Sequence, residues 1–351
     1  MSAPALVPSK ISVVILNYNG AVWLQRCFDS LRAQTIFPAI EVIVADNASA
    51  DGSDKFAEEV LRTWSNGLFI QNGGNLGFSE GNNRGAARAT GQFLFFLNND
   101  TWLEPDCLEQ LYNAAVVHQA DGGMPVVLDY PDDHFQSLGA SGFDWFGIPN
   151  DQPPTSAPVE LFAAAGCSIL VRSEMFRRVG GFDAAHFLYA EETDLSWRIL
   201  IAGGRLFGVP AARMHHRGAV AVNPEGQTRV VESRTSETKR FLANRNGLLL
   251  LLKNAQHVLL LLVIPHLFLL GFEALVSLLL VRRWSYVRQS YVRAVPACWA
   301  MRAHVRDWRR RIRGFRQRGD FQMLRFLRFK PSRWTDFTKL LHWGVPKVDR
   351  R

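Results

Sequence analysis

The stretch ISVVILNYNG, residues 11–20, decides the fold: a short run rich in β-branched residues is followed at once by turn-forming residues. Similar runs recur downstream, and longer amphipathic stretches separate them. Short apolar runs that alternate with amphipathic ones are typical of strands joined by crossover helices. We therefore predict an α/β fold with a mostly parallel sheet. The expected strands are 11–16, 41–45, 68–71, 93–97 and 124–128, and the expected helices are 22–34, 53–64, 79–89 and 105–118.

Regular structure is expected to continue beyond this region. Residues 129–158 are rich in Pro, Asp, Gly and Ser, which predicts a long functional loop. A strand at 166–171, a helix from 173, a helix from about 191 and a strand at 205–209 should follow.

Composition narrows the class of protein. The chain has 351 residues, of which 48% are hydrophobic and 21% are charged, and these values exclude a disordered or collagen-like protein. Its four cysteines are far apart, which excludes a cysteine-based zinc site and favours a reducing compartment. The first 20 residues lack a basic n-region, so we expect no signal peptide.

Charge is unevenly distributed along the chain. Residues 1–281 hold 20 Lys and Arg against 28 Asp and Glu, whereas residues 282–351 hold 20 against 4. The stretch 248–281 before this basic part is strongly apolar. We therefore expect three parts: a nucleotide-binding domain at 1–247, apolar membrane-associated helices at 248–281, and a basic, aromatic-rich helical tail at 282–351.

The apolar part is long enough to cross a bilayer, because the segment from Val258 to Val281 comprises 24 residues. Pro265, Gly271 and the ionisable Glu273 argue against a simple span. A single crossing would also place the basic tail opposite the first domain, against the positive-inside tendency. We expect the helices to lie in one leaflet, on the cytoplasmic face of the inner membrane. The alternative is a buried hairpin or an interface between copies of the chain.

Polar residues follow each of the first four predicted strands. Because the carboxyl ends of parallel strands meet at one sheet edge, these residues should converge there. A nucleotide needs an aromatic or apolar wall and a hydrogen-bond acceptor for its base, together with close backbone approach to its phosphates. Tyr18 offers the wall, Asp46 the acceptor and Gly77 the close approach. The expected nucleotide-binding residues are Asn17, Tyr18, Asn19, Asp46, Asn75, Gly77, Asn82, Asn99 and Asp100.

Two further positions suggest catalytic chemistry. Asp100 ends an apolar strand, and its carboxylate suits a hard divalent cation shared with a diphosphate. His215 or His216, which follow the predicted strand 205–209, would supply a second ligand. Two adjacent histidines point in different directions, so we expect at most one of them to reach the metal. Glu191, Glu192 and Asp194 open a helix, and one of them would act as a general base. Arg198 lies one turn further on and can pair with Glu191 or Asp194.

The ordered set of motifs resembles a known family. It comprises ILNYNG, DNASADGS, NGGNLGFSEGNNRG, FLNND, GCSILVRSEMFRRVGGFD, LYAEETDLSWRI and HHRG. These motifs are similar to those of inverting family 2 glycosyltransferases of the GT-A fold, and most similar to the bacterial rhamnosyltransferase-like branch. The resemblance covers residues 11–218, and the Arg245-Asn246 pair with the leucine run after it also looks like that branch.

The resemblance implies a metal-dependent inverting transferase with a UDP- or dTDP-sugar donor, Mn²⁺ or Mg²⁺, and a lipid-linked or glycan acceptor in cell-envelope polysaccharide synthesis. Asp100 falls where the family keeps the last Asp of its metal motif, and Asn98 replaces the first. His216 is the second metal candidate. Glu192 falls where the family usually has a catalytic Asp. Gly166 and Cys167 would lie on the acceptor side.

Two alternatives come from other classes. Asn98 and Glu192 depart from the commoner family residues, which would suit a non-catalytic protein that binds a nucleotide sugar or a lipid. The basic tail, with its interleaved aromatic residues, would suit nucleic acid, although the apolar sequence beside it favours a membrane surface.

Overall fold

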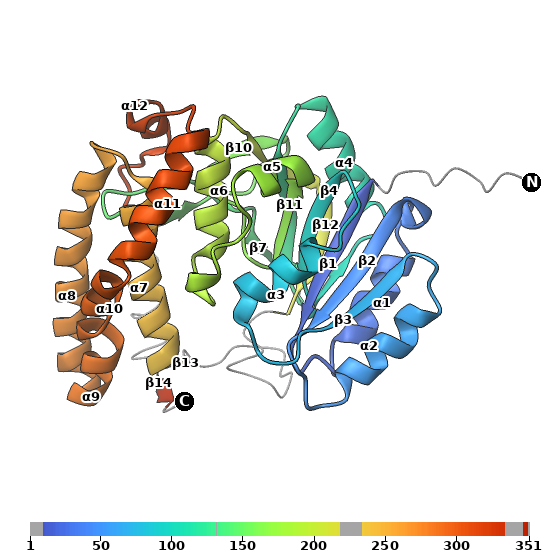
Figure 1. The fold of residues 1–351 in the computed structure, drawn as a ribbon, viewed down its shortest axis with the longest axis horizontal. Helices are drawn as coiled ribbons and strands as arrows, with labels where there is room; N and C mark the ends of the chain where they lie inside the picture. The colour runs from blue at the N-terminus through green and yellow to red at the C-terminus, as the bar shows by residue number, and fades with distance from the viewer. Residues whose placement is uncertain (1–9, 131, 218–233, 334–346, 350–351) are drawn as a thin grey trace, which may run out of the picture.

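The computed structural model describes residues 10–130, 132–217, 234–333 and 347–349 (Figure 1). Expectations for the extreme N-terminus and for 334–346 and 350–351 of the basic tail lie outside the described residues.

One ten-stranded mixed sheet forms the centre of the molecule. Eight strands follow the order β10-β12-β6-β11-β4-β1-β2-β3, while β5 pairs with β12 and β7 pairs with β6. The first strands are β1 (Ile11–Asn17), β2 (Ile40–Asp46), β3 (Gly67–Gln71), β4 (Phe93–Asn98) and β5 (Thr101–Leu103). The remaining sheet strands are β6 (Gly122–Asp129), β7 (Phe135–Ser137), β10 (Val159–Leu161), β11 (Ser168–Arg172) and β12 (Leu206–His216).

The predicted parallel half of the sheet is confirmed. Strand β1 pairs in parallel with both β2 and β4, and β2 pairs in parallel with β3. Helix α3 packs on one face of this half, and α1 and α2 lie on the other (Figure 1). After β3 the chain returns to β4, which pairs with the side of β1 opposite to β2, so the strand order reverses there. Ligands bind at such a switch point in open α/β sheets. The helices of this half are α1 (Leu24–Arg32), α2 (Ser53–Arg62), α3 (Gly77–Ala86) and α4 (Cys107–Val117).

The other half of the sheet differs from the prediction in three ways. Strand β11 is antiparallel to both β4 and β6, so it separates the first four strands from the fifth predicted one. The strand expected to end at 209 continues as β12 to His216, with a register shift between Val209 and Arg213 around Pro210. The expected loop 129–158 contains β7 and a small hairpin of β8 (Ala140–Phe143) and β9 (Pro149–Asp151).

The C-terminal part packs against the sheet domain through a layer of helices. Helix α7 (Glu237–Asn254) contacts α6 (Glu191–Ile201), and α11 (Arg302–Phe315) contacts both. Trp308 and Ile312 of α11 are buried in the main core. The other elements are α5 (Ser173–Arg178), α8 (Val263–Val281), α9 (Trp284–Val287), α10 (Ala294–Ala300), α12 (Asp320–Met323), a π-turn at Arg288–Val292, and a strand pair of β13 (Arg234–Ser236) and β14 (Lys347–Asp349).

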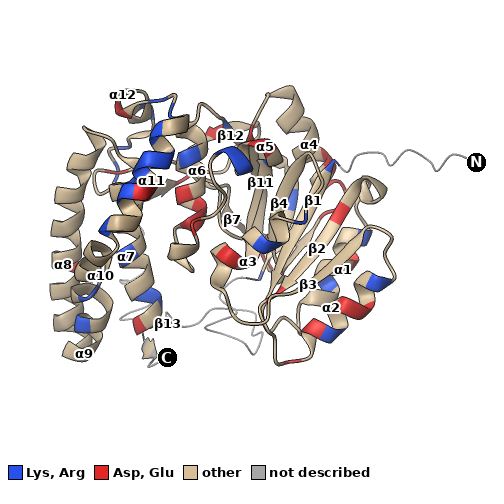
Figure 2. Ribbon diagram, viewed as in Figure 1, with Lys and Arg blue, Asp and Glu red and all other residues tan. Residues whose placement is uncertain are grey.

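Helix α8 and the turn before it form the one segment, among the described residues, that is long and apolar enough to cross a membrane. Leu259–Val281 has a mean hydropathy of 2.3, and only 22% of its most apolar window is buried. Figure 1 places α8 at the side of the molecule away from the sheet, and Figure 2 shows it almost free of charged residues.

Candidate active site

The polar residues after the parallel strands converge, as predicted, and Asn17 is their centre. Its side-chain amide donates to Asp46 Oδ1 at 2.8 Å and to Ser53 Oγ at 2.9 Å. Its Oδ1 accepts a hydrogen bond from Asn99 at 2.8 Å, so three strand ends are joined by one buried side chain. A Cβ on Gly20 would collide with the side chains of Asn17 and Asn99, which is why the turn after β1 requires glycine there.

Asp46 lies at the end of β2 and is fully buried. Both carboxylate oxygens accept hydrogen bonds from neighbouring protein groups, including the backbone N–H of Ser49 at 2.9 Å and the side-chain amide of Gln71 at 3.1 Å. The Ser49 hydroxyl donates to the other oxygen at 2.6 Å. In this arrangement Asp46 orders the loop after β2, and it would contact a base only after some of these bonds rearrange.

The next polar group joins the ends of β2 and β3 to the start of α3. Asn47 donates to the Gly77 carbonyl at 3.1 Å, and its own oxygen accepts from Asn72 at 2.9 Å. Asn75 Oδ1 accepts from the Gly77 N–H at 3.0 Å. Gly77 has a φ of +76°, and a Cβ there would lie 2.5 Å from Phe187. Asn82 is buried in α3, where its amide donates to the Phe78 carbonyl at 3.0 Å.

Two candidates from the NYNG turn differ in accessibility and role. Tyr18 is 49% exposed at the edge of this polar group, as a wall for a base would need to be. Asn19 has a φ of 53°, and its Oδ1 accepts from the Ala50 N–H at 2.9 Å. Asn19 therefore ties the turn after β1 to the loop after β2.

Asp100 and His216 lie together at the end of β4. Their nearest atoms, His216 Nε2 and Asp100 Oδ1, are 3.4 Å apart, and Asp100 is 8% exposed. Burial disfavours the charged imidazole, but the contacts with Cys167 and Asp100 raise the pKa of His216 well above its ordinary value. His215 points away from this pair: its ring stacks on Trp102 and lies 3.5 Å from Glu104. Of the two histidines, His216 is the one beside Asp100.

Gly166 and Cys167 connect this pair to the acidic start of α6. Cys167 contacts His216, and the Cys167 carbonyl accepts the Asn98 N–H at 3.1 Å. A Cβ on Gly166 would lie 3.6 Å from Glu192 Oε2. Asp100, His216, Cys167, Gly166 and Glu192 thus form a continuous series of neighbours from the end of β4 to α6.

The two adjacent glutamates have different environments. Glu192 is partly exposed beside Gly166, whereas Glu191 is buried and its Oε2 has no hydrogen-bond partner among the described residues. Burial, together with the charge of Glu192, raises the pKa of Glu191 well above its ordinary value. Burial also raises the pKa of Glu192. Of the two glutamates, Glu192 is therefore the more exposed, and it lies on the side of Gly166.

The third acidic candidate, Asp194, lies in a different setting from Glu192. It is fully buried and pairs with Arg198 at 2.8 Å, which makes Asp194 the partner among the two that the spacing allowed. It also accepts from Lys253 at 3.1 Å and from Asn254 at 2.8 Å. Burial disfavours its charge, but Arg198 and Lys253 hold the pKa of Asp194 well below its ordinary value. With both oxygens engaged, Asp194 has the environment of a structural ion pair.

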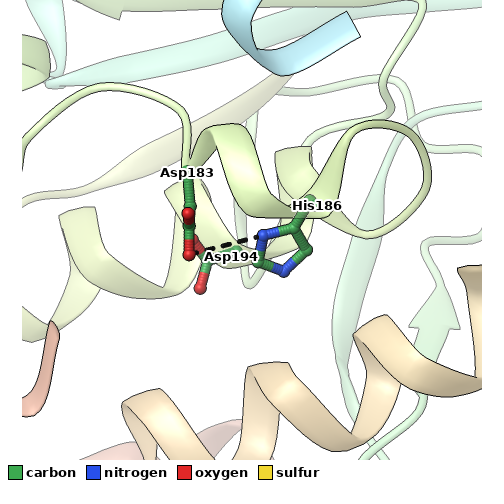
Figure 3. A group of neighbouring side chains, drawn as sticks. All are labelled: Asp183, His186 and Asp194. Atoms are coloured by element: carbon green, nitrogen blue, oxygen red, sulfur yellow. Dashed lines mark ion pairs between the residues drawn. The ribbon is translucent and has the colours of Figure 1, made fainter. Parts of the chain in front are cut away.

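Asp183, His186 and Asp194 offer ligand atoms within 4.8 Å of one another (Figure 3). Three such donors resemble a metal site. However, the ammonium of Lys253 contacts both carboxylates, and His304 lies 2.9 Å from Asp183. Since Lys253 and Arg198 already balance the charge of the two acids, this cluster is better explained as an ion-pair network than as a divalent metal site.

Sequence reasoning did not anticipate this network. Asp183 and Asp194 lie in two of the motifs quoted above, but their partners Lys253 and His304 lie far downstream, the latter 121 positions after Asp183. One signal was present: Lys253 is a single charge at the end of the leucine run of α7. A lysine in such a run needs an acidic partner if it is buried.

Comparison with known proteins agrees with this geometry. Residues 12–180 match the family described as glycosyl transferase family 2. Among characterised relatives, an N-acetylglucosaminyl-diphospho-decaprenol L-rhamnosyltransferase of Mycobacterium tuberculosis is 26% identical over 268 residues, which cover 68% of this chain and 85% of the relative. The glycosyltransferase GlyA of Streptococcus pneumoniae is 34% identical over 116 residues, or 33% of this chain.

The chain spans only 16% of GlyA and 30% of the putative glycosyltransferase EpsH of Bacillus subtilis. Among solved structures, S. aureus TarS 1–349 in complex with UDP has a TM-score of 0.57 at 16% identity, covering 87% of this chain and 89% of TarS. GalNAc-T7 with UDP, GalNAc and Mn²⁺ has a TM-score of 0.59 at 20% identity, covering 72% of this chain and 49% of GalNAc-T7.

Proposed function

We propose that this chain, whose residues 12–180 form a family 2 glycosyltransferase domain of the GT-A fold, transfers a sugar with inversion from a nucleotide-diphosphate donor to an acceptor hydroxyl. The observation that carries the proposal is the series of neighbouring residues from Asp100 through His216 and Cys167 to Gly166 and Glu192. It puts a candidate ligand for a diphosphate-bound cation and a candidate base at one edge of the sheet.

In this mechanism Glu192 accepts the proton of the acceptor hydroxyl while the hydroxyl oxygen forms a bond to the anomeric carbon. The bond from that carbon to the diphosphate oxygen breaks, and its electron pair leaves with the diphosphate. A single displacement of this kind inverts the anomeric centre. The burial that raises the pKa of Glu192 also makes it a stronger base than an exposed glutamate.

Asp100 and His216 fit a divalent cation in donor type, since one offers a carboxylate oxygen and the other an imidazole nitrogen 3.4 Å away. A single carboxylate leaves coordination positions for diphosphate oxygens, so the site would be completed by the donor. Mn²⁺ or Mg²⁺ bound there would neutralise charge on the leaving diphosphate. The Mn²⁺ and UDP in the structure of GalNAc-T7 support this assignment.

For the donor we propose a UDP- or dTDP-sugar, with rhamnose as the candidate sugar, and for the acceptor a lipid-linked glycan or a polysaccharide. Rhamnose and the lipid carrier rest on the name of the mycobacterial relative, and UDP on the complexes of TarS and GalNAc-T7.

We further propose that the chain docks on the cytoplasmic leaflet of the inner membrane through α8. Five exposed apolar residues repeat every three or four positions along this helix, which aligns them on one face: Ile264, Phe268, Phe272, Leu275 and Leu279. Phe268 is 76% exposed. Helix α10 returns to contact α7, and His304 on α11 contacts Asp183. Because the segments before and after α8 pack on one body, the helix suits an in-plane position better than a span.

A donor screen tests the proposed activity. The full chain is incubated with UDP- and dTDP-sugars, Mn²⁺ and a bacterial lipid extract, and release of nucleoside diphosphate is measured. We expect one donor to be turned over, with loss of turnover in EDTA. Release no faster than the uncatalysed rate with every donor would contradict the proposal and favour a protein that only binds.

A further inference from the structure

The loop that leads into α6 has an unusual backbone. Phe187, Tyr189 and Ala190 have φ values of 63°, 72° and 66°, although none of them is glycine. Each such conformation costs on the order of 1–3 kcal/mol and persists only when surrounding contacts impose it. The loop ends directly at Glu191 and Glu192, so its conformation determines where the candidate base points.

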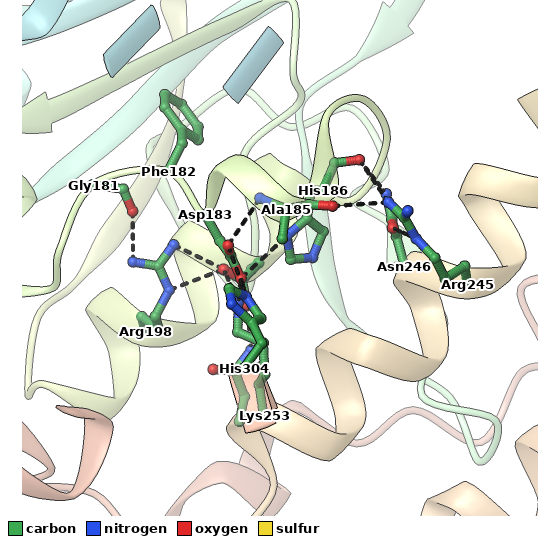
Figure 4. Close-up of polar contacts among 12 residues, drawn as sticks. Gly181, Phe182, Asp183, Ala185, His186, Arg198, Arg245, Asn246, Lys253 and His304 are labelled. Atoms are coloured by element: carbon green, nitrogen blue, oxygen red, sulfur yellow. Dashed lines mark hydrogen bonds and ion pairs between the residues drawn. The ribbon is translucent and has the colours of Figure 1, made fainter. Parts of the chain in front are cut away.

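Helix α7 imposes this conformation chiefly through Asn246. The buried side-chain amide of Asn246 donates to the carbonyls of His186 at 2.9 Å, Leu188 at 2.9 Å and Tyr189 at 2.8 Å. Three carbonyls that converge on one amide group can do so only if the chain between them is sharply bent. Figure 4 shows Asn246 beside the loop, on the α7 side.

Arg245 adds to the same attachment. Its guanidinium donates to the carbonyls of Ala185 at 2.8 Å and His186 at 3.1 Å, and its Nε donates to Asn246 Oδ1 at 2.9 Å. The last bond orients the Asn246 amide so that its N–H groups face the loop. Two consecutive residues of α7 therefore donate hydrogen bonds to four backbone carbonyls in the five residues 185–189, just before α6.

The loop also contacts the nucleotide edge of the sheet. The Phe187 carbonyl accepts the N–H of Phe78 at the start of α3. Phe187 packs against Gly77 where a Cβ would lie 2.5 Å from its ring. The strained loop thus lies between α7 on one side and the Gly77 turn on the other.

We infer that Asn246 is a positioning residue, which holds the loop 186–190 in its positive-φ conformation and thereby keeps the Glu192 carboxylate beside Gly166. This inference rests on the proposed function of Glu192 as the base. It also assigns a role to α7: the helix that precedes the membrane-docking segment sets the geometry of the catalytic helix.

The test compares Asn246→Ala with Asn244→Ala, a matched change two residues earlier on the same helix. Asn244 is also buried, but its amide donates to the Ser290 carbonyl at 2.9 Å, away from the loop. Both variants lose an asparagine amide from α7, so a general loss of stability should affect both.

Two readouts are measured on the full chain: amide hydrogen exchange of the peptide covering 185–192, and kcat and KM for the donor. We expect Asn246→Ala to speed exchange in 185–192 at least tenfold and to lower kcat by roughly 10- to 100-fold, with the donor KM within about threefold. Asn244→Ala should leave both within about twofold. Equal effects of the two variants, or unchanged exchange in Asn246→Ala, would overturn the inference.

A second variant covers the case in which Asn246→Ala does not fold. Arg245→Met removes the bonds to the Ala185 and His186 carbonyls from a half-buried position, and it should give the same pattern at smaller size, about 3- to 10-fold in kcat. If Asn246→Ala does not fold, an unchanged rate of amide hydrogen exchange in the peptide 185–192 of Arg245→Met would overturn the inference. If the wild-type chain transfers no sugar, the proposed function fails, while the exchange comparison still decides whether α7 holds the loop.

Discussion

Lys253 on α7 donates to Asp194 on α6 across 3.1 Å, and both side chains are fully buried. The same ammonium contacts Asp183, and Arg198 pairs with Asp194 from within α6. Figure 4 shows Lys253, Asp183 and Arg198 close to one another in this network. Because a cation lies between the two acids, α6 and α7 are joined electrostatically as well as by packing, and the C-terminal helices are part of the structural support of the candidate active site.

Removal of this cation should be strongly destabilising. Lys253→Met leaves two buried carboxylates short of a partner, so we expect the free energy of unfolding to fall by about 3–5 kcal/mol. The control is Arg62→Met, which breaks a surface pair with Glu58 and should change stability by less than about 1 kcal/mol. Urea unfolding measures both. Similar small changes in the two variants would mean that the network contributes little.

The location of the metal can be tested by substitution. Asp100→Ala should weaken Mn²⁺-dependent binding of the nucleotide-sugar donor at least tenfold in calorimetry, because the cation would bridge protein and diphosphate in the bound state. Asp183→Asn should lower thermal stability and leave the metal dependence of binding unchanged. If the effects are reversed, the Asp183, His186 and Asp194 cluster holds the metal.

His186 makes stability depend on pH. Burial and the charge of Lys253 lower the pKa of His186 to about 4, from an ordinary value of 6.5. Between these values the unfolded chain binds a proton that the folded chain does not, so folding stability is lost as the pH falls from 6.5 towards 4, by up to about 3 kcal/mol. His186→Gln should flatten this part of the stability curve, and the same change at the exposed His257 should not. An unaltered curve for His186→Gln would contradict this reading.

Membrane docking should depend on the exposed face of α8. Phe268→Glu with Phe272→Glu should abolish flotation of the full chain with vesicles of phosphatidylcholine and phosphatidylglycerol, because two carboxylates would enter the apolar layer. Val117→Glu, at an equally exposed apolar residue on α4, should leave flotation unchanged. High salt should release the wild-type chain only partly, since it screens arginines but not apolar contacts. Flotation that survives the double substitution would exclude α8 as the docking face.

The sequence predicted the elements whose signals are local. Runs such as ISVVIL and FLFFL identified β1 and β4, and the polar residues after them were expected at one edge because parallel strands share it. The antiparallel insertion of β11 was missed, since pairing order depends on contacts that no single segment encodes. Likewise, the strand was predicted to end at 209, before Pro210. In the structure a bulge follows Val209 and pairing with β6 resumes at Arg213, so β12 continues.

For the candidate site, the sequence likewise predicted residues next to strand and helix ends, but not the partners that come from distant parts of the chain. Asp100 was singled out because it follows an apolar strand, whereas the residues alone left its partner open between His215 and His216. The side chains show that His216 is the one beside Asp100. Asp194 was grouped with Glu191 and Glu192 because all three open one helix. Lys253 and Asn254 lie 59 and 60 positions after Asp194 in the sequence. Only the fold brings them to its carboxylate, where they donate to both oxygens.

The most direct test of the account is the rate of sugar transfer by Glu192→Gln and Glu191→Gln, measured with donor binding under the same conditions. A base is needed in the transition state and not for holding the nucleotide, so Glu192→Gln should lower kcat by about 10²- to 10⁴-fold while the donor Kd stays within a few-fold. Glu191→Gln should retain kcat within about tenfold. Near-full turnover by Glu192→Gln, with loss of turnover in Glu191→Gln, would contradict the assignment of Glu192 as the base.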